Sequence, residues 1–191
     1  SISATIKVTM VMNVPRTTIH GQTSMLTEKN SWRSKALGAV AIKTAYTLRK
    51  GSRSLDVMTV VDNQCRGHRL RVFFPTDVAA ESSYAEAPFD VVERRIRRDA
   101  KNPWRCYRYM TFPMVRFVGV EKGGRGFAFI GDGLREYEIV DDRRRTMAVT
   151  LLRAFFVRMC TTSGMLLEER PSDLSQCIGK TSFAYSLYPY K

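Results

Sequence analysis

The chain has 191 residues, of which 44% are hydrophobic and 26% are charged, a composition typical of a globular protein with one sizeable core. This composition excludes a membrane-embedded protein, because no apolar run approaches the roughly 20 residues that a membrane-spanning helix needs. The formal net charge of +13 raises the question of an anionic partner such as nucleic acid, acidic lipid or an acidic ligand.

The first part of the chain predicts a strand followed by a long loop. Residues 5–14 alternate between apolar and polar side chains up to a proline, which indicates a strand with one face in the core. Residues 15–35 show no period and are rich in Thr, Ser, Gly and Lys, so we expect a long loop that exposes Arg16, His20 and Trp32.

Four further strands are predicted in the next part of the chain. Residues 40–48 and 55–61 alternate on either side of a turn that contains glycine, which predicts a β-hairpin. Residues 68–74 form another strand, which ends at a proline. A loop of small residues over 76–88 then leads to a short strand at 89–97.

An aromatic cluster precedes the next predicted strand. Asn102 and Pro103 open a turn, and three aromatic side chains follow it: Trp104, Tyr107 and Tyr109. Residues 114–120 predict a strand, and the two glycines at 123 and 124 turn the chain into the next one.

The stretch 125–153 carries the strongest strand pattern. Residues 125–130 and 134–140 alternate with a period of two, and Asp132-Gly133 between them suits a type I′ turn, which needs φ > 0 at both central residues. We therefore predict a β-hairpin here. After a second turn at Asp141-Asp142, residues 146–152 carry apolar side chains on both faces, as expected of a strand in the middle of a packed sheet.

The end of the chain predicts a loop over 161–176 and a final strand around 183–187. This strand pattern still runs at Lys191, so we expect the sequence to be a fragment of a longer protein. About ten strands at short spacing with almost no helix predict an all-β fold. We predict one domain over residues 1–191, a large antiparallel β-sandwich.

The titratable residues form no recognised catalytic or metal-binding motif. The two histidines have no metal-ligand spacing, and we expect His68 to make structural hydrogen bonds. Glu136 and Glu138 are two apart on one strand and so share a face, where the arginines of 143–145 could neutralise them. A charge-paired face is favoured over the catalytic carboxylate pair of a glycoside hydrolase. We predict no metal site and no catalytic residue in this chain.

The four cysteines, Cys65, Cys106, Cys160 and Cys177, lie far apart and form no CxxC pair. We expect reduced, mostly buried thiols. Because the sequence starts with a strand pattern instead of a signal peptide, we predict a cytoplasmic location. The basic residues fall in short clusters along strands and turns without a nucleic-acid-binding motif, so we favour a solvated surface over the binding of nucleic acid or another anion.

Three stretches together resemble the β-sandwich region of glycoside hydrolase family 38, the α-mannosidases, and especially its bacterial branch that includes mannosylglycerate hydrolases. They are residues 48–76, 89–96 and 126–153. Weaker similarity at 169–179 and 183–190 extends the resemblance over about residues 4 to 190, with the segments in the same order and spacing. The resemblance implies a supersandwich with a galactose-mutarotase-like fold.

The resemblance also implies a parent enzyme that hydrolyses α-mannosides with retention, using zinc and an aspartate nucleophile in an N-terminal (β/α) barrel-like domain outside this chain. This fragment alone would be inactive and would hold no cofactor. In family members a loop from this region carries an arginine to the sugar, and its counterpart here is Arg170, between Glu169 and Pro171. A guanidinium could bind sugar hydroxyls or the carboxylate of an aglycone such as glycerate.

Three functional hypotheses therefore follow from the sequence. The first is a noncatalytic β-sandwich domain of an α-mannosidase-type glycoside hydrolase, which supports the catalytic domain and completes the carbohydrate cleft. The second is a free-standing carbohydrate-binding module that uses the aromatic cluster at 104–109. The third is a basic β-protein that binds nucleic acid. The resemblance favours the first.

Overall fold

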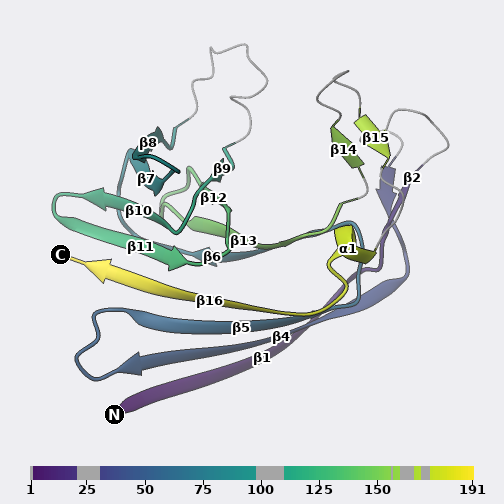
Figure 1. Cartoon of the computed structure of the whole chain (residues 1–191), viewed down its shortest axis with the longest axis horizontal. Coiled ribbons are helices and arrows are strands. Elements are labelled where there is room, and N and C mark those ends of the chain that lie inside the picture. Colours follow the sequence, from purple (N-terminus) through teal and green to yellow (C-terminus); the bar gives the residue numbers. More distant parts are fainter. Residues whose placement is uncertain (1, 21–30, 98–109, 156, 160–165, 169–172) are drawn as a thin grey trace.

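The computed structural model describes residues 2–20, 31–97, 110–155, 157–159, 166–168 and 173–191 (Figure 1). The larger of its two main sheets has eight strands, in the order β1 (Ser3–Pro15), β4 (Leu37–Arg49), β5 (Leu55–Asn63), β16 (Gly179–Tyr190), β11 (Arg125–Gly131), β10 (Phe117–Lys122), β7 (Ser82–Glu86) and β8 (Val91–Arg95). The smaller sheet has the order β6 (Arg69–Phe74), β13 (Met147–Arg153), β12 (Glu136–Ile139) and β9 (Phe112–Pro113). All of these pairings are antiparallel, so the predicted all-β antiparallel sandwich is confirmed.

Smaller elements complete the described part of the chain. Two ribbons are formed by β2 (Thr18–His20) with β3 (Ser31–Arg33), and by β14 (Val157–Met159) with β15 (Leu166–Glu168). The short helix α1 spans Asp173–Gln176. The predicted loop over 15–35 therefore contains two short strands, and the predicted loop over 76–88 contains β7.

The hairpin of β4 and β5 is confirmed, and so is the turn of two glycines between β10 and β11. Gly123 and Gly124 have φ angles of 59° and 78°, the left-handed conformation that glycine adopts without steric cost. The final strand β16 is inserted in the centre of the large sheet, where Tyr185 faces Val57 of β5 on one side and Gly131 of β11 on the other.

The predicted hairpin across Asp132-Gly133 is wrong. Both edges of β11 are occupied, by β10 and by β16, whereas β12 lies in the other sheet. The turn therefore carries the chain from one sheet to the other. The same turn residues occur in hairpins, so the local sequence does not distinguish the two cases. The next prediction is confirmed, because β12 pairs with β13, and six of the seven residues of β13 are buried, in a strand that lies between β6 and β12.

The core lies between the two sheets and is centred on aromatic side chains. Phe129 of β11 stacks on Tyr185 of β16 with ring centroids 5.0 Å apart, and Phe74 of β6 in the small sheet lies 5.9 Å from Phe129. Tyr137 of β12 is fully buried, and its hydroxyl forms a 3.1 Å hydrogen bond with Ser83 of β7. Large aromatic side chains thus join strands of opposite sheets.

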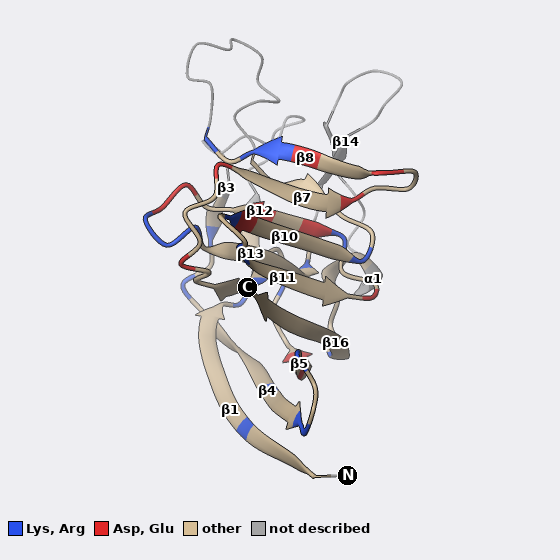
Figure 2. Ribbon diagram, turned by 90° about the vertical axis from the view of Figure 1, so that its left-hand side faces the viewer, with Lys and Arg blue, Asp and Glu red and all other residues tan. Residues whose placement is uncertain are grey.

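The prediction that one face of the first strand lies in the core is wrong. β1 is exposed along nearly all of its length and, within the described residues, pairs only with β4. The small sheet packs over the middle of the large one and stops before it reaches this edge, so the apolar side chains of β1 remain in solvent (Figure 2).

Phe129 supplies the first prediction. Phe129→Ala should lower the free energy of unfolding by about 3–5 kcal/mol, because it leaves a cavity between Tyr185 and Phe74. Phe89, which is fully exposed, offers the same substitution as a control and should change stability by less than about 0.5 kcal/mol. Urea unfolding followed by near-UV circular dichroism measures both, and equal effects would contradict this assignment of the core.

Candidate functional site

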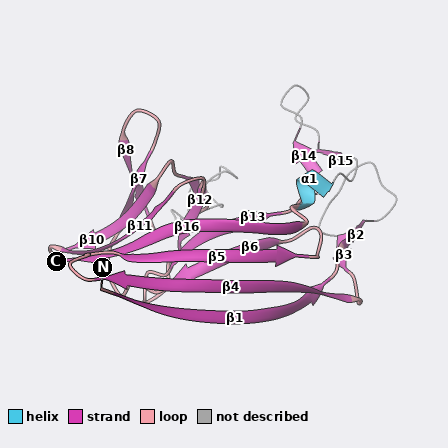
Figure 3. Ribbon diagram, turned by 60° about the horizontal axis from the view of Figure 1, so that its bottom comes forward, coloured by secondary structure: helices cyan, strands magenta, loops and turns pink. Residues whose placement is uncertain are grey.

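Several short elements gather at one end of the sandwich. The helix α1, the ribbon of β14 and β15 and the ribbon of β2 and β3 all lie beside the end of β5 and the start of β6 (Figures 1 and 3). The predicted sugar-binding residue Arg170 lies outside the described residues. The elements that flank it in the sequence, β15 and α1, are both at this end.

Two buried amide side chains fix α1 to the sandwich. Asn63, the last residue of β5, donates from Nδ2 to the carbonyl oxygens of Cys65, Gln176 and Cys177 at 3.0, 3.1 and 3.0 Å. Gln176 accepts a 2.8 Å hydrogen bond from the backbone N–H of Gly67 and donates a 2.6 Å bond to the carbonyl of Phe155. Both side chains are fully buried and cannot hydrogen-bond to solvent, so these bonds within the protein satisfy their polar groups.

The ribbon of β2 and β3 is tied to the same corner through an arginine. Arg33 donates from Nη1 to the hydroxyl of Thr18 at 2.9 Å and also to the carbonyl of Gly67. Thr18 bonds the same carbonyl, at 3.0 Å. The ribbon, the turn at Gly67 and α1 therefore form one hydrogen-bonded corner.

His68 lies at this corner, beside the positive charge of Arg33. Burial lowers the pKa of its ring, the nearby Arg33 guanidinium lowers it further, and interaction with the Arg66 backbone opposes them. Both ring nitrogens are buried, and neither has a hydrogen-bond partner of good geometry in the described part of the chain. The hydrogen-bonding role predicted for His68 is therefore not seen, and a neutral ring suits this site beside a fixed positive charge.

A charge-paired surface covers the outer face of the small sheet. Glu136 accepts from Arg69 at 2.8 Å, from Arg153 at 2.6 Å and from the hydroxyl of Thr150 at 2.7 Å. Glu138 pairs with Arg71 at 2.6 Å. The predicted charge-paired face is thus confirmed, with cross-strand arginines of β6 and β13 as partners.

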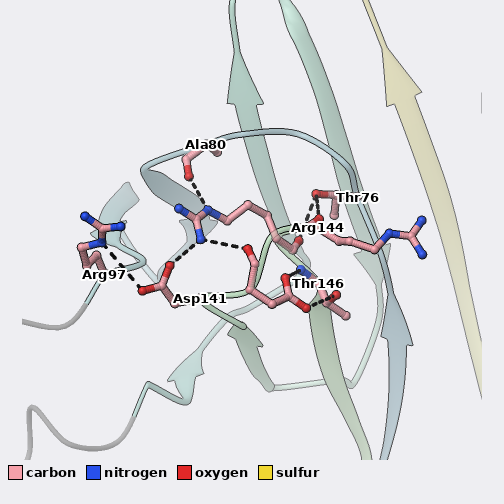
Figure 4. A network of polar contacts seen from close by, with 8 residues as sticks. Thr76, Ala80, Arg97, Asp141, Arg144 and Thr146 are labelled. Carbon is pink, nitrogen blue, oxygen red and sulfur yellow. Dashed lines mark hydrogen bonds and ion pairs between the residues drawn. The ribbon is translucent and has the colours of Figure 1, made fainter.

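The prediction that the arginines of 143–145 neutralise these glutamates is wrong, because Arg144 and Arg145 bond residues at and beside their own turn (Figure 4). Arg145 bonds the carbonyl of Ala80 at 2.9 Å and the side chain of Asp141, while Arg144 forms a two-pronged pair with Asp77 at 2.8 and 2.7 Å. These bonds tie the turn between β12 and β13 to the segment that precedes β7, so the arginine cluster serves the fold locally.

Asp142 closes the same turn. The carboxylate of Asp142 accepts two hydrogen bonds from Thr146, one from the hydroxyl at 2.7 Å and one from the backbone N–H at 2.9 Å. The hydroxyl contact is the largest cause that lowers the pKa of Asp142 below its ordinary value of 3.8. The carboxylate is thus held ionised as part of the turn, an arrangement that serves structure.

Among the described residues, no group of three or more His, Cys, Asp and Glu side chains could hold a metal ion. Cys65 and Cys177 are free, Cys65 is buried, and burial raises the pKa of its thiol. Cys106, Cys160 and the aromatic cluster of Trp104, Tyr107 and Tyr109 lie outside the described residues. None of the helices in the described ranges has the length and apolar character required to span a bilayer.

Comparison with known proteins identifies relatives for nearly the whole chain. Residues 5–157 match the family described as the C-terminal domain of glycosyl hydrolases family 38. A protein of Halalkalibacterium halodurans named "Putative mannosylglycerate hydrolase" is 32% identical over 164 residues, which are 86% of this chain and 17% of that protein. These matches confirm the family resemblance.

Two solved structures share the fold. An α-mannosidase from Enterococcus faecalis V583 superposes with a TM-score of 0.83 at 25% identity, over 99% of this chain and 21% of that one. A glycosyl hydrolase family 38 protein from Enterococcus faecalis gives a TM-score of 0.73, with the same identity and coverage. The chain therefore spans about a fifth of the length of the relatives it matches.

The anchoring of α1 gives the second prediction. Gln176→Leu should lower the free energy of unfolding by about 1–3 kcal/mol, because it removes the partners of the part-buried N–H of Gly67 and carbonyl of Phe155. Hydrogen exchange over residues 173–178 should speed up as α1 loosens. The matched control is Gln64→Leu. The side chain of Gln64 is exposed, and its Nε2 donates a hydrogen bond to the carboxylate of the nearby Asp62. An equal loss in both variants would show that Gln176 has no special anchoring role.

Proposed function

Because the chain belongs to glycosyl hydrolase family 38 and residues 5–157 match its C-terminal domain, we propose that it is a noncatalytic β-sandwich domain of an α-mannosidase-type enzyme. It supports the catalytic domain and completes the carbohydrate cleft. The substrate class is α-mannosides, including mannosylglycerate. This proposal extends to the chain what the names of its relatives say of them.

The observation that carries this proposal is the unequal coverage of the structural match. Nearly all of this chain, 99%, superposes on an α-mannosidase of which it represents only 21%. The chain thus corresponds to one folded part of a much longer enzyme. The two glutamates that come closest to a carboxylate pair, Glu136 and Glu138, are both bound by arginines, which supports a role outside the chemistry.

The catalytic groups belong to the remainder of the parent enzyme under this proposal. A retaining mechanism, with an aspartate nucleophile and a zinc ion, would be supplied by the N-terminal catalytic domain. Among the described residues of this chain, no group of three or more His, Cys, Asp and Glu side chains could hold that metal ion. A cytoplasmic location is also part of the proposal, and the free thiols of Cys65 and Cys177 support it.

The contribution of this domain to the cleft is assigned to Arg170. The next described element in the sequence, α1, begins at Asp173 and is anchored through Gln176 and Asn63. A guanidinium donates paired hydrogen bonds to neighbouring sugar hydroxyls or to the carboxylate of a glycerate aglycone. We propose this role for Arg170 in the parent enzyme.

The third prediction separates the domain from its parent. The full-length gene product should hydrolyse 4-nitrophenyl α-mannoside, whereas residues 1–191 alone should release no nitrophenol above the buffer rate, because the reacting carboxylates lie elsewhere. The release of nitrophenol at 400 nm measures both. Turnover by the 191-residue chain would contradict the proposal, and so would a full-length product without an upstream catalytic region.

The fourth prediction concerns Arg170 in the full-length enzyme. Arg170→Ala should lower kcat/KM about 10- to 100-fold, since hydrogen bonds to a charged group are worth about 1.5–3 kcal/mol. Arg170→Lys should recover only part of this loss, because an ammonium lacks the paired geometry. Arg143, an exposed arginine of the β12–β13 turn, is the control for loss of charge. Unchanged kinetics in Arg170→Ala would remove this residue from the cleft.

A further inference from the structure

The inner face of the large sheet continues as an apolar surface beyond the small sheet. The register of β1 on β4 places four exposed apolar side chains beside residues that face the core. These cross-strand pairs are Ile6 with Tyr46, Val8 with Thr44, Met10 with Ile42, and Met12 with Val40. Val14, the next member of the same row, already packs against the buried cluster of Val40, Ile42, Val61 and Cys65. The uncovered row is therefore a continuation of the core.

The limit of the cover is set by β6. Phe74, at one end of this strand, contacts Phe127, Phe129 and Tyr185 of β11 and β16. Leu70, near the other end, packs against the buried cluster on β4 and β5. The strand thus crosses the large sheet diagonally, from its centre toward β4.

Exposure of the inner face follows this diagonal. On β4, Val40 and Ile42 are buried near Leu70, whereas Leu48 at the far end is 52% exposed. On β1, Ile6 is 69% exposed, and the exposure falls toward Met12. The apolar side chains of β1 and of the far end of β4 are therefore uncovered, in a part of the large sheet that extends beyond the small sheet (Figure 2).

The edge of β6 that faces this surface is unpaired in the part of the chain that the structure describes. β6 is the first strand of the small sheet and bonds only β13 on its other side. One more strand beside β6 would pair its free backbone groups and lie over β4 and β1. A free strand edge is a template for pairing with another strand, and a contiguous exposed apolar face marks a surface to which another part of a protein binds.

We propose that a β-strand from the remainder of the parent polypeptide, outside residues 1–191, pairs with the free edge of β6 and covers Ile6, Val8 and Met10. This inference rests on the proposed function and names the surface through which the domain joins its parent. Both relatives contain enough additional chain to supply such a strand, because about four-fifths of each lies outside the match. The strand carries apolar residues at alternate positions toward β1, and polar residues outward beside Arg69 and Arg71.

Methionine oxidation tests this inference with a control inside the same molecule. Met10 and Met58 are 48% and 47% exposed but lie on opposite faces of the large sheet, since Met58 alternates with the buried Val57 and Thr59. In the 191-residue chain, dilute peroxide should oxidise both at similar rates. In the full-length protein Met10 should react at least about tenfold more slowly than in the 191-residue chain, while Met58 reports general reactivity. Hydrogen exchange at residues 69–74 should slow in parallel.

Two results would overturn the inference. One is equal oxidation of Met10 in the full-length protein and in the 191-residue chain. The other is a protected Met10 in the 191-residue chain together with a dimer on size-exclusion chromatography, because a second copy would then be the occupant. A full-length protein that hydrolyses the mannoside but leaves Met10 reactive refutes this inference and leaves the proposed function intact. A full-length protein in which Met10 is protected but which does not hydrolyse the mannoside supports this inference and refutes the proposed function.

Discussion

The packing of a four-stranded sheet onto the middle of an eight-stranded sheet is the constraint on which this domain depends. Phe129 and Tyr185 on the large sheet meet Phe74 on the small one, and this contact decides which strands are buried. β13, between two neighbours and under the large sheet, is buried on both faces, whereas β1 lies beyond the cover and is exposed. The burial of each strand therefore depends on its position relative to the smaller sheet.

Local features of this fold could be predicted from the sequence, but the partners of the strands could not. Alternation and glycine turns correctly predicted the β4–β5 and β10–β11 hairpins, and the run of apolar residues predicted the central place of β13. The residues Asp132-Gly133 predict a hairpin because they favour a tight turn, but a tight turn does not determine whether the two strands that it joins pair with each other. The true partners of these strands depend on β16, which enters the large sheet from the far end of the sequence.

The polar contacts of the small sheet and of α1 show the same division between what the sequence predicts and what it does not. That Glu136 and Glu138 share a face followed from their spacing, but their partners Arg69, Arg71 and Arg153 come from strands distant in the sequence. Asn63 could have been recognised as unusual, because it occupies a core-facing position in an otherwise apolar and Thr-containing alternation of β5. No such pattern marks its partner Gln176, the last residue of α1, because Gln176 is buried only when α1 docks against the sandwich.

The account holds that this chain is a structural part of a longer glycoside hydrolase and that the parent polypeptide completes its hydrophobic core. A crystal structure of the full-length protein tests this claim most directly. It should show residues 1–191 in the same two sheets, with a strand from another part of the polypeptide bonded to β6 above the inner face of β1. A structure in which that edge and that face are both open to solvent would contradict the account.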